Sequence, residues 1–408
     1  MRRSRRSFLD VLAGGRSDAG YDTGLWIAAR GREAREASEH EDAQAQAAPG
    51  GAAPARPALP PGVKAIRISS NENPLGPGKA ALDALVRKFP EAGRYPFNST
   101  PADSALVTAI ATKFGAKPEN VVLGAGSQEI LKSAVRAFTS PTRSLVTAAP
   151  SFENCPQLAK KLGHPVTEIN VDAALRLDLD AMAAAARGAG LVFLNNPNNP
   201  TATVHGSKAV AAFVHKVRAS SPDTVILIDE AYHDYVTDPS YQSAIPLAMQ
   251  TPNVFVARTF SKAYGMAGLR IGYAMGQAAT LKPLAQLKMP YNVSVFGVAA
   301  ALAAFADTKH IEAERARNAE VRAFTVKALD DLGCKSSDSQ GNFLFVETGR
   351  PADAFRDACA AQGIMVGRPF PPLEKTHARI SLGTMEEMKK ATAVFRNVLR
   401  PVTTTAGK

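Results

Sequence analysis

Short apolar segments alternate with longer stretches of helical composition from Val121 onward. A short apolar run with polar or turn residues at its ends predicts a buried strand. Such runs are Val121–Leu123, Ser144–Ala148, Leu191–Leu194, Thr224–Ile228, Val254–Ala257 and Ile271–Ala274. The stretches between them are long enough for crossover helices, for example Gln128–Phe138, Pro156–Leu162 and Ser207–Arg218. This alternation predicts an α/β fold whose parallel sheet is covered by helices on both faces.

The pattern changes after Tyr291. An alanine-rich helical stretch, Val298–Leu332, precedes β-rich runs at Asn342–Glu347 and Ala378–Leu382. This order predicts a smaller α+β domain at the C-terminal end.

The N-terminal region differs from the rest of the chain. Ser4–Leu9 (SRRSFL) is similar to the twin-arginine export motif, but Asp10 and Arg16 interrupt the apolar stretch that should follow. Two interpretations stay open: an export signal that leads to the periplasm, or the basic leader of a cytoplasmic protein. The Ala/Pro/Gly-rich composition that follows is typical of a flexible linker. The predicted organisation is a leader (1–35), a linker (36–62), an N-terminal arm (63–95), a large domain (96–290) and a small domain (291–400).

Composition narrows the function classes. The formal charge of +11 is spread along the chain, and no basic block interleaved with aromatic residues predicts nucleic-acid binding. A diffuse positive excess instead favours small anionic ligands. No apolar run approaches the roughly 20 residues that span a bilayer. The three cysteines have no spacing typical of a metal site or a disulfide framework, and Cys155 is interpreted as a structural residue rather than a reactive thiol.

The residues that follow the predicted strands are candidates for chemistry, because ligands bind at the carboxyl ends of parallel strands. Asp229 is either a helix cap or an acid that faces a ligand. Lys262 is either a surface residue or an amine nucleophile, and Arg270 is a cation that would lower the pKa of such an amine. The segment Gly124–Ser127 joins a strand to a helix, where backbone N–H groups can hold a phosphate.

These segments, taken together and in order, resemble the fold-type I pyridoxal-phosphate (PLP) aminotransferases, and within them the histidinol-phosphate aminotransferase branch. The resemblance covers about residues 66–400. The matching motifs are Asn71-Glu72-Asn73-Pro74, Arg94-Tyr95-Pro96, Gly124-Ala125-Gly126-Ser127-Gln128-Glu129, Pro150-Ser151-Phe152, Asn198-Asn199-Pro200-Thr201, Asp229-Glu230-Ala231-Tyr232, Arg258-Thr259-Phe260-Ser261-Lys262, Gly268-Leu269-Arg270-Ile271-Gly272 and Ala378-Arg379-Ile380-Ser381-Leu382-Gly383-Thr384.

The resemblance implies a large PLP-binding domain with a mostly parallel sheet, a smaller α+β domain, and transamination. Lys262 corresponds to the lysine that links covalently to PLP and then shuttles a proton. Asp229 corresponds to the carboxylate that pairs with the pyridine nitrogen and keeps it protonated. Tyr232 and Asn199 correspond to the two donors to the phenolic oxygen of PLP.

The remaining implied contacts hold the phosphate, the ring and the substrate. The resemblance assigns the PLP phosphate to Ala125, Gly126, Ser127, Gln128, Ser261 and Arg270. It stacks Phe152 on the pyridine ring, and it makes Tyr95 reach the cofactor of the neighbouring subunit in a homodimer. Arg379, with Asn199, corresponds to the site for the substrate carboxylate, because a guanidinium binds a carboxylate with two hydrogen bonds. Arg368 corresponds to a contact with a second substrate anion.

Departures from the family pattern leave the substrate open. Ala202 replaces the glycine of the family's Asn-Pro-Thr-Gly motif, and the segment Val366-Gly367-Arg368-Pro369 shifts Arg368 from its usual register. The predicted reaction moves an amino group between an amino acid, with glutamate as donor, and a keto or aldehyde acceptor. The alternatives are a fold-type I decarboxylase or lyase that keeps the same lysine and aspartate, and a non-catalytic PLP-fold ligand-binding protein.

Overall fold

The computed structural model describes residues 65–96 and 104–399. The predicted leader and linker lie outside the described residues, so export and localisation stay predictions, as do the domain boundaries.

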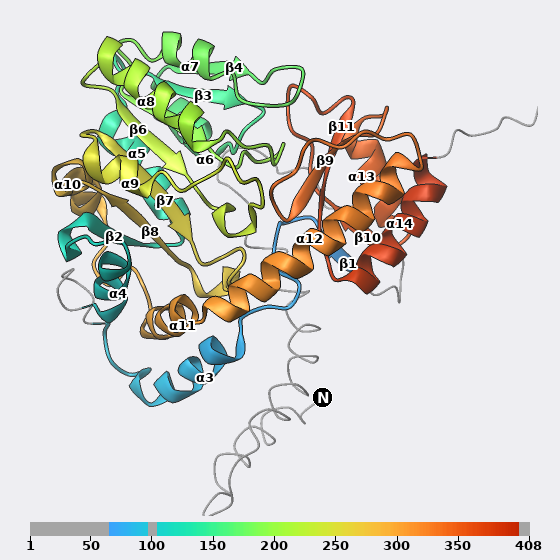
Figure 1. Ribbon diagram of the computed structural model, residues 1–408, viewed down its shortest axis with the longest axis horizontal. Coiled ribbons are helices and arrows are strands. Elements are labelled where there is room, and N and C mark those ends of the chain that lie inside the picture. The colour runs from blue at the N-terminus through green and yellow to red at the C-terminus, as the bar shows by residue number, and fades with distance from the viewer. Residues whose placement is uncertain (1–64, 97–103, 400–408) are drawn as a thin grey trace, which may run out of the picture. The chain divides into compact units, whose positions relative to one another are not determined.

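A seven-stranded sheet forms the centre of the fold (Figure 1), with its strands in the order β2-β8-β7-β6-β5-β3-β4. The strands are β2 (Val121–Ala125), β8 (Ile271–Gly276), β7 (Val254–Thr259), β6 (Val225–Asp229), β5 (Leu191–Asn195), β3 (Leu145–Ala149) and β4 (Val166–Asn170). All six predicted strands are present. The sequence pattern missed β4, which is an edge strand without a fully buried residue and therefore lacks a continuous apolar run.

The sheet is mostly parallel, which confirms the sheet that the resemblance implies and corrects the entirely parallel sheet inferred from the strand–helix alternation. Strand β8 runs antiparallel to both of its neighbours, β7 and β2. The connection from β7 to β8 is residues 260–270, and its only helical element is the short η5 (Ala267–Leu269). A parallel return needs a crossover of a dozen or more residues, usually with a helix, so this short connection brings the chain back in the opposite direction.

Both faces of the sheet are buried by helices, as predicted. In β5, Leu191 and Phe193 contact one core, and Val192 and Leu194 contact another. The first core includes residues of α5 (Ser127–Phe138), α6 (Asn154–Lys161) and α10 (Ala278–Leu287). The second includes residues of α4 (Ala105–Lys113), α7 (Leu179–Ala185), α8 (Ser207–Ser220), α9 (Ile245–Gln250) and α11 (Val295–Ala306). A strand covered on both sides is apolar at successive positions, which is why the sequence pattern reveals it.

The C-terminal part has a core of its own. Its strands form two pairs: β1 (Ile66–Ile68) with β10 (Ile364–Val366) in parallel, and β9 (Phe343–Glu347) with β11 (His377–Ser381) in antiparallel. Helices α13 (Ala352–Ala360) and α14 (Met385–Leu399) pack with them. Strand β1 therefore joins the start of the described chain to its C-terminal part.

The predicted helical stretch Val298–Leu332 is two helices. Helix α11 ends at Ala306, and Asp307 caps α12 (Thr308–Asp330) by accepting a hydrogen bond from the backbone N–H of His310. Helix α12 connects the two parts (Figure 1), because Ile311 packs in the core of the large sheet and Leu329 packs in the C-terminal core. The remaining elements are α3 (Lys79–Lys88), which packs on α11, and η1 (Phe89–Glu91), η3 (Pro118–Asn120) and η4 (His233–Tyr235).

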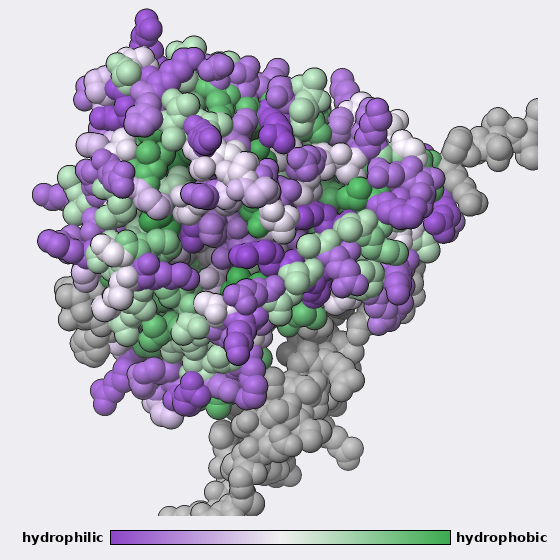
Figure 2. Space-filling model, viewed as in Figure 1, coloured by the Kyte–Doolittle hydropathy of each residue, from purple (hydrophilic) through white to green (hydrophobic). Residues whose placement is uncertain are grey.

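Charged and polar side chains cover much of the face seen in Figure 2, interleaved with smaller hydrophobic areas. Among the described residues, no helix is long and apolar enough to cross a membrane. Cys155 is free and fully buried, and burial raises the pKa of its thiol well above the usual value. Its interpretation as a structural residue is therefore confirmed.

Candidate active site

The candidate residues gather at one edge of the large sheet. Asp229 is the last residue of β6, and Lys262 lies three residues beyond the end of β7. Because β6 and β7 are parallel, their carboxyl ends share this edge. Strand β8 is antiparallel to β7, so its first residues lie at the same edge and bring Arg270 there. The strand direction that the sequence pattern did not predict thus brings Arg270 to the same edge of the sheet as Lys262.

Lys262 lies in a small polar cluster. Its Nζ donates a hydrogen bond to the backbone oxygen of Ser70 at 3.2 Å and lies 5.6 Å from the centroid of the Tyr232 ring. The hydroxyl of Tyr232 accepts a hydrogen bond from Nδ2 of Asn71 at 3.0 Å. The amine and the phenol that the resemblance assigns to the cofactor are therefore neighbours.

Asp229 is a buried carboxylate without a full set of partners. The residue is 3% exposed, and Oδ1 of its side chain has no hydrogen-bond partner among the described residues. Burial raises the pKa of this carboxyl from 3.8 to about 7, although the backbone N–H of Ala231 and the charge of Lys262 act in the opposite direction. An unpaired buried oxygen is costly, so this position favours a ligand that donates a hydrogen bond or carries positive charge.

The raised pKa of Asp229 predicts a pH-dependent stability of the cofactor-free protein. Between pH 4 and 7 the folded state holds a proton that the unfolded chain has released, so the stability due to this group is lost as the pH rises through about 7. The full effect is up to about 4 kcal/mol. Thermal unfolding of the cofactor-free protein and its Asp229→Asn variant from pH 5 to 8 should show the variant gaining relative stability as the pH rises. Parallel curves would contradict the raised pKa.

The segment between β2 and α5 forms a cradle with the segment before β8. Gly126 has φ +70°, and a Cβ at this position would overlap Nη2 of Arg270. Only glycine allows this close approach in this backbone conformation. Nη1 of Arg270 donates to Oγ of Ser261 at 3.3 Å, and Ser127 is the first residue of α5. A helix N-terminus beside a guanidinium and a hydroxyl is a suitable arrangement for a phosphate.

Two other residues assigned to the phosphate have different surroundings. The backbone N–H of Ala125 already donates to Oε2 of Glu129 at 2.6 Å. Gln128 is exposed as the second residue of α5. The side chains closest to the cradle are therefore those of Ser127, Ser261 and Arg270.

Arg379 reaches the site from β11. It is 7% exposed; Nη1 donates to Oδ1 of Asn199 at 2.9 Å, and Nη2 donates to the backbone oxygen of Ser69. Its Nε is buried and has no partner among the described residues. Burial lowers the pKa of this guanidinium to about 10, the charge of Arg368 also lowers it, and Tyr232 and Glu153 raise it. Its hydrogen-bond partners are neutral groups, so the positive charge is available to an anion.

Arg368 lies near Arg379 but is already paired. Its guanidinium forms an ion pair with the carboxylate of Glu153, the residue after Phe152. The guanidinium carbons of Arg368 and Arg379 lie 4.1 and 4.8 Å from the centroid of the Phe370 ring. Phe152 is partly buried and packs against a core of the large sheet. The shifted register therefore leaves Arg368 beside the candidate substrate arginine.

Tyr95 is not part of this cluster. It is 75% exposed, and its ring centroid lies 5.2 Å from that of Tyr291, which is also exposed. Nothing in the described chain brings it to Lys262 or Arg270.

The sequence analysis assigned no role to Asn71, although its motif was among those matched. Asn71 has φ 56°, its backbone N–H donates to Oγ of Ser381 at 2.9 Å, and the same hydroxyl donates to Oδ1 of Asn71 at 2.6 Å. Asparagine tolerates this left-handed conformation better than most residues. Asn71 thus connects Tyr232 to β11, the strand of Arg379.

The residues fit PLP. The orphaned Oδ1 of Asp229 suits a protonated pyridine nitrogen, the glycine cradle with Arg270 suits a phosphate, and the amine of Lys262 lies at the same sheet edge. Among residues 65–96 and 104–399, no group of three His, Cys, Asp or Glu side chains is placed to hold a metal ion.

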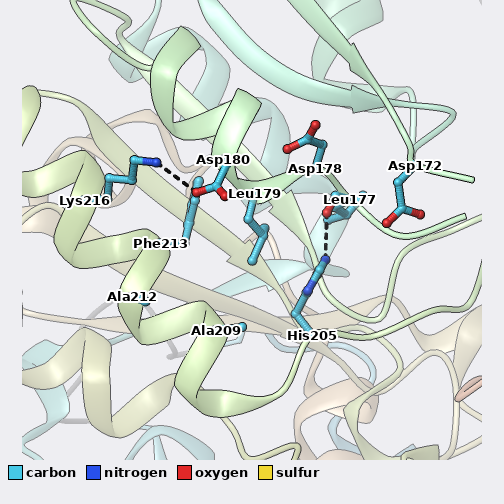
Figure 3. Close-up of a pocket in the computed structure, with 10 residues that line it drawn as sticks. All are labelled: Asp172, Leu177, Asp178, Leu179, Asp180, His205, Ala209, Ala212, Phe213 and Lys216. Atoms are coloured by element: carbon cyan, nitrogen blue, oxygen red, sulfur yellow. Dashed lines mark hydrogen bonds and ion pairs between the residues drawn. The ribbon is translucent and has the colours of Figure 1, made fainter. Parts of the chain in front are cut away.

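A pocket of about 510 Å³ lies elsewhere, between the start of α7 and helix α8 (Figure 3). Its polar groups are already engaged in structural contacts. Asp180 pairs with Lys216, Asp178 accepts the backbone N–H of Ala181 as a helix cap, and His205 contacts the backbone oxygen of Leu177. None of the candidate residues lines this pocket, and it carries no comparable chemistry.

The chain is similar in sequence and fold to known aminotransferases. The family model described as aminotransferase class I and II matches residues 63–395. The histidinol-phosphate aminotransferase of Moorella thermoacetica is 33% identical over 341 residues, which is 83% of this chain and 86% of that protein. Histidinol-phosphate aminotransferase 1 of Cupriavidus pinatubonensis is 35% identical over 82% of this chain and 88% of its own length. The crystal structure of the Sinorhizobium meliloti histidinol-phosphate aminotransferase in complex with pyridoxal-5'-phosphate matches with a TM-score of 0.77 and 30% identity, over 83% of this chain and 91% of that one.

Proposed function

The chain belongs to the class I and II aminotransferases, which makes it a PLP-dependent transaminase, and we propose that it uses glutamate as amino donor for a keto or aldehyde acceptor. The observation that carries the proposal is the pairing of two features at one sheet edge. Asp229 offers a buried carboxylate oxygen without a partner, and Lys262 offers an amine nearby.

When bound, PLP supplies an electron sink for the carbon from which the proton is removed. Lys262 would move that proton, because its amine is the base at the sheet edge. Asp229 would hold its negative charge opposite the pyridine nitrogen and keep it protonated. Tyr232 and Asn199 would donate hydrogen bonds to the phenolic oxygen. Because Oδ1 of Asn199 accepts a hydrogen bond from Arg379, the amide group of Asn199 is fixed with Nδ2 as its donor.

Arg379 is the residue through which the site would bind the substrate. Its guanidinium is buried, positively charged and bonded only to neutral oxygens of Asn199 and Ser69. We propose that it binds the α-carboxylate of the amino acid with two hydrogen bonds, which orients the substrate as well as holding it. This fixed orientation favours proton removal over loss of the carboxylate, and therefore transamination over decarboxylation.

An absorbance spectrum of the purified holoenzyme tests this proposal. L-Glutamate should remove the absorbance band of the lysine-bound cofactor, and 2-oxoglutarate should restore it. L-Histidinol phosphate is the second amine to test, since relatives at 33–35% identity carry that name. Loss of the band with both amines would identify histidinol phosphate as a substrate, and loss with glutamate alone would direct the search to other acceptors. An unchanged spectrum with every amino acid would contradict transamination.

We also propose that the enzyme is a homodimer. Tyr95 and Tyr291 are exposed, and their rings contact each other in a tilted arrangement with centroids 5.2 Å apart. Phe89 and Met289, six and two residues before them in the chain, are 60% and 70% exposed. The ring of Phe89 also packs against that of Phe296 on α11, with centroids 5.6 Å apart, so residues 89–95 lie against the segment that leads into α11. Exposed apolar clusters of this kind are typical of protein interfaces.

Mixed dimers test the role of Tyr95. Tyr95→Ala and Lys262→Ala variants, each weakly active or inactive alone, should regain partial activity when they are unfolded together and refolded. In a mixed dimer one site holds both defects and the other holds neither, provided that Tyr95 serves the partner's site. No recovery, or a monomeric mass by light scattering, would contradict the proposal.

A further inference from the structure

Two arginines at the substrate end of the site differ in their electrostatic surroundings. Arg379 and Arg368 both stack on Phe370, with guanidinium carbons 4.8 and 4.1 Å from the ring centroid. Arg379 is bonded to neutral oxygens, whereas Arg368 has the carboxylate of Glu153 as its partner. The substrate end of the site therefore has one guanidinium whose hydrogen-bond partners are neutral and one that is paired with a carboxylate, although the charge of Glu153 also acts on Arg379.

The carboxylate of Glu153 pairs with Arg368 and does not cap the helix that follows it. Glu153 is the N-cap residue of α6, but its side chain accepts no hydrogen bond from the first turn of that helix. It turns instead to Arg368, which follows β10 in the C-terminal part of the fold. The ion pair thus joins the segment after β3 to the segment after β10.

We infer that Glu153 is a specificity-determining residue, because its carboxylate competes with the second anionic group of a substrate for the guanidinium of Arg368. A substrate with a neutral far end leaves the Glu153–Arg368 pair intact, and a dicarboxylate such as glutamate has to replace Glu153. This inference rests on the proposed function, since it concerns the substrate that Arg379 holds by its α-carboxylate.

Exposure makes this exchange possible. The side chains of Arg368 and Glu153 are 44% and 24% exposed, so solvent screens the pair and weakens it. The ion pair of Arg258 and Glu230 is the contrasting case. Its side chains are 10% and 1% exposed, and Glu230 also accepts hydrogen bonds from Ser243 and Ala244. A substrate anion can displace the first carboxylate but cannot reach the second.

The experiment compares ligands that differ only in the charge of the far end. L-Glutamate and L-glutamine form such a pair for the reaction, and glutarate and its monoamide form one for binding without reaction. The rates of cofactor conversion and the dissociation constants by calorimetry are measured for the wild-type holoenzyme and for Glu153→Gln. The matched control is Glu168→Gln, because Glu168 also forms a partly exposed ion pair, with Lys160 at 2.8 Å, between β4 and the end of α6 opposite Glu153.

Glu153→Gln should tighten glutarate binding and lower the KM for glutamate by about three- to fivefold, the range of a partly exposed ion pair. The monoamide and glutamine should change by less than about twofold, and Glu168→Gln should behave as the wild type. Arg368→Gln should weaken glutarate but not its monoamide, and it should abolish the effect of Glu153→Gln in the double variant.

An unchanged preference between glutarate and its monoamide in Glu153→Gln would overturn the inference, as would an unchanged glutarate affinity in Arg368→Gln. Either result can be distinguished from a failure of the proposed function. A wild-type enzyme that reacts with glutamate but keeps its preference after Glu153→Gln contradicts only the role of Glu153. A wild-type enzyme that reacts with no amino acid contradicts transamination itself.

Discussion

Lys262→Ala is expected to abolish turnover and the absorbance band of the lysine-bound cofactor. Proton transfer by a positioned side chain contributes about 10²–10⁴-fold to a rate, and Lys262 is also the amine that would hold the cofactor covalently. We therefore expect a loss of at least about 10⁴-fold in kcat. The lysine contacts the backbone oxygen of Ser70 and the ring of Tyr232, and alanine removes both contacts without filling the space.

The control for this variant is Lys208→Ala, because Lys208 is an exposed lysine on α8. It should keep the spectrum and the activity of the wild type. Lys262→Ala should still bind PLP through the phosphate cradle, but dialysis should remove the cofactor. Turnover within tenfold of the wild-type value in Lys262→Ala would disprove the assignment of this lysine.

Asp229→Asn is expected to lower kcat by about 10²–10³-fold, the effect of removing one electrostatic group from a buried site. Asparagine has nearly the same shape but no negative charge, so it cannot keep the pyridine nitrogen protonated. Asp229 is 3% exposed and its Oδ1 has no hydrogen-bond partner among the described residues, so no neighbouring side chain replaces its charge.

Steady-state kinetics and the spectrum of the bound cofactor measure this effect. Asp223→Asn is the matched control, since Asp223 is exposed and lies two residues before the same strand, β6. The Asp229 variant should bind PLP and show the spectrum of the lysine-bound cofactor, with the defect confined to proton removal. A kcat close to that of the wild type would show that the charge of Asp229 does not assist the reaction.

The parts of the site that follow buried strands were predictable from sequence. Strand β6 is buried at every position and therefore reads as a continuous apolar run, and Asp229 stands at its end. Lys262 and Arg270 were recognisable as charged residues in a glycine- and serine-rich connection. The direction of β8 was not predictable from its apolar run, because the same burial pattern fits a parallel or an antiparallel strand.

Contacts between segments that are distant in the chain could not be predicted from the sequence. Asn71 and Ser381 are 310 residues apart in the chain, and no local pattern indicates that they meet. The pairing of Glu153 with Arg368 depends on how the C-terminal part folds against the large sheet. Ala202 is a different case: it has φ 59°, a conformation that favours glycine, which explains why the family motif has glycine there.

The antiparallel return of β8 also has a consequence for how the enzyme is assembled during synthesis. The amine of Lys262 and the guanidinium of Arg270 lie in one hairpin, which closes a short loop at little entropic cost. The substrate end of the site instead depends on contacts between distant segments. Strand β1 pairs with β10, and Asn71 bonds to Ser381, so neither contact can form until the C-terminal part has been synthesised. Contacts between such distant segments form late, because long loops must close first. A ribosome-bound chain that ends after β8 would therefore have the groups that hold PLP but not the two arginines, Arg368 and Arg379, that would bind the anionic groups of a substrate.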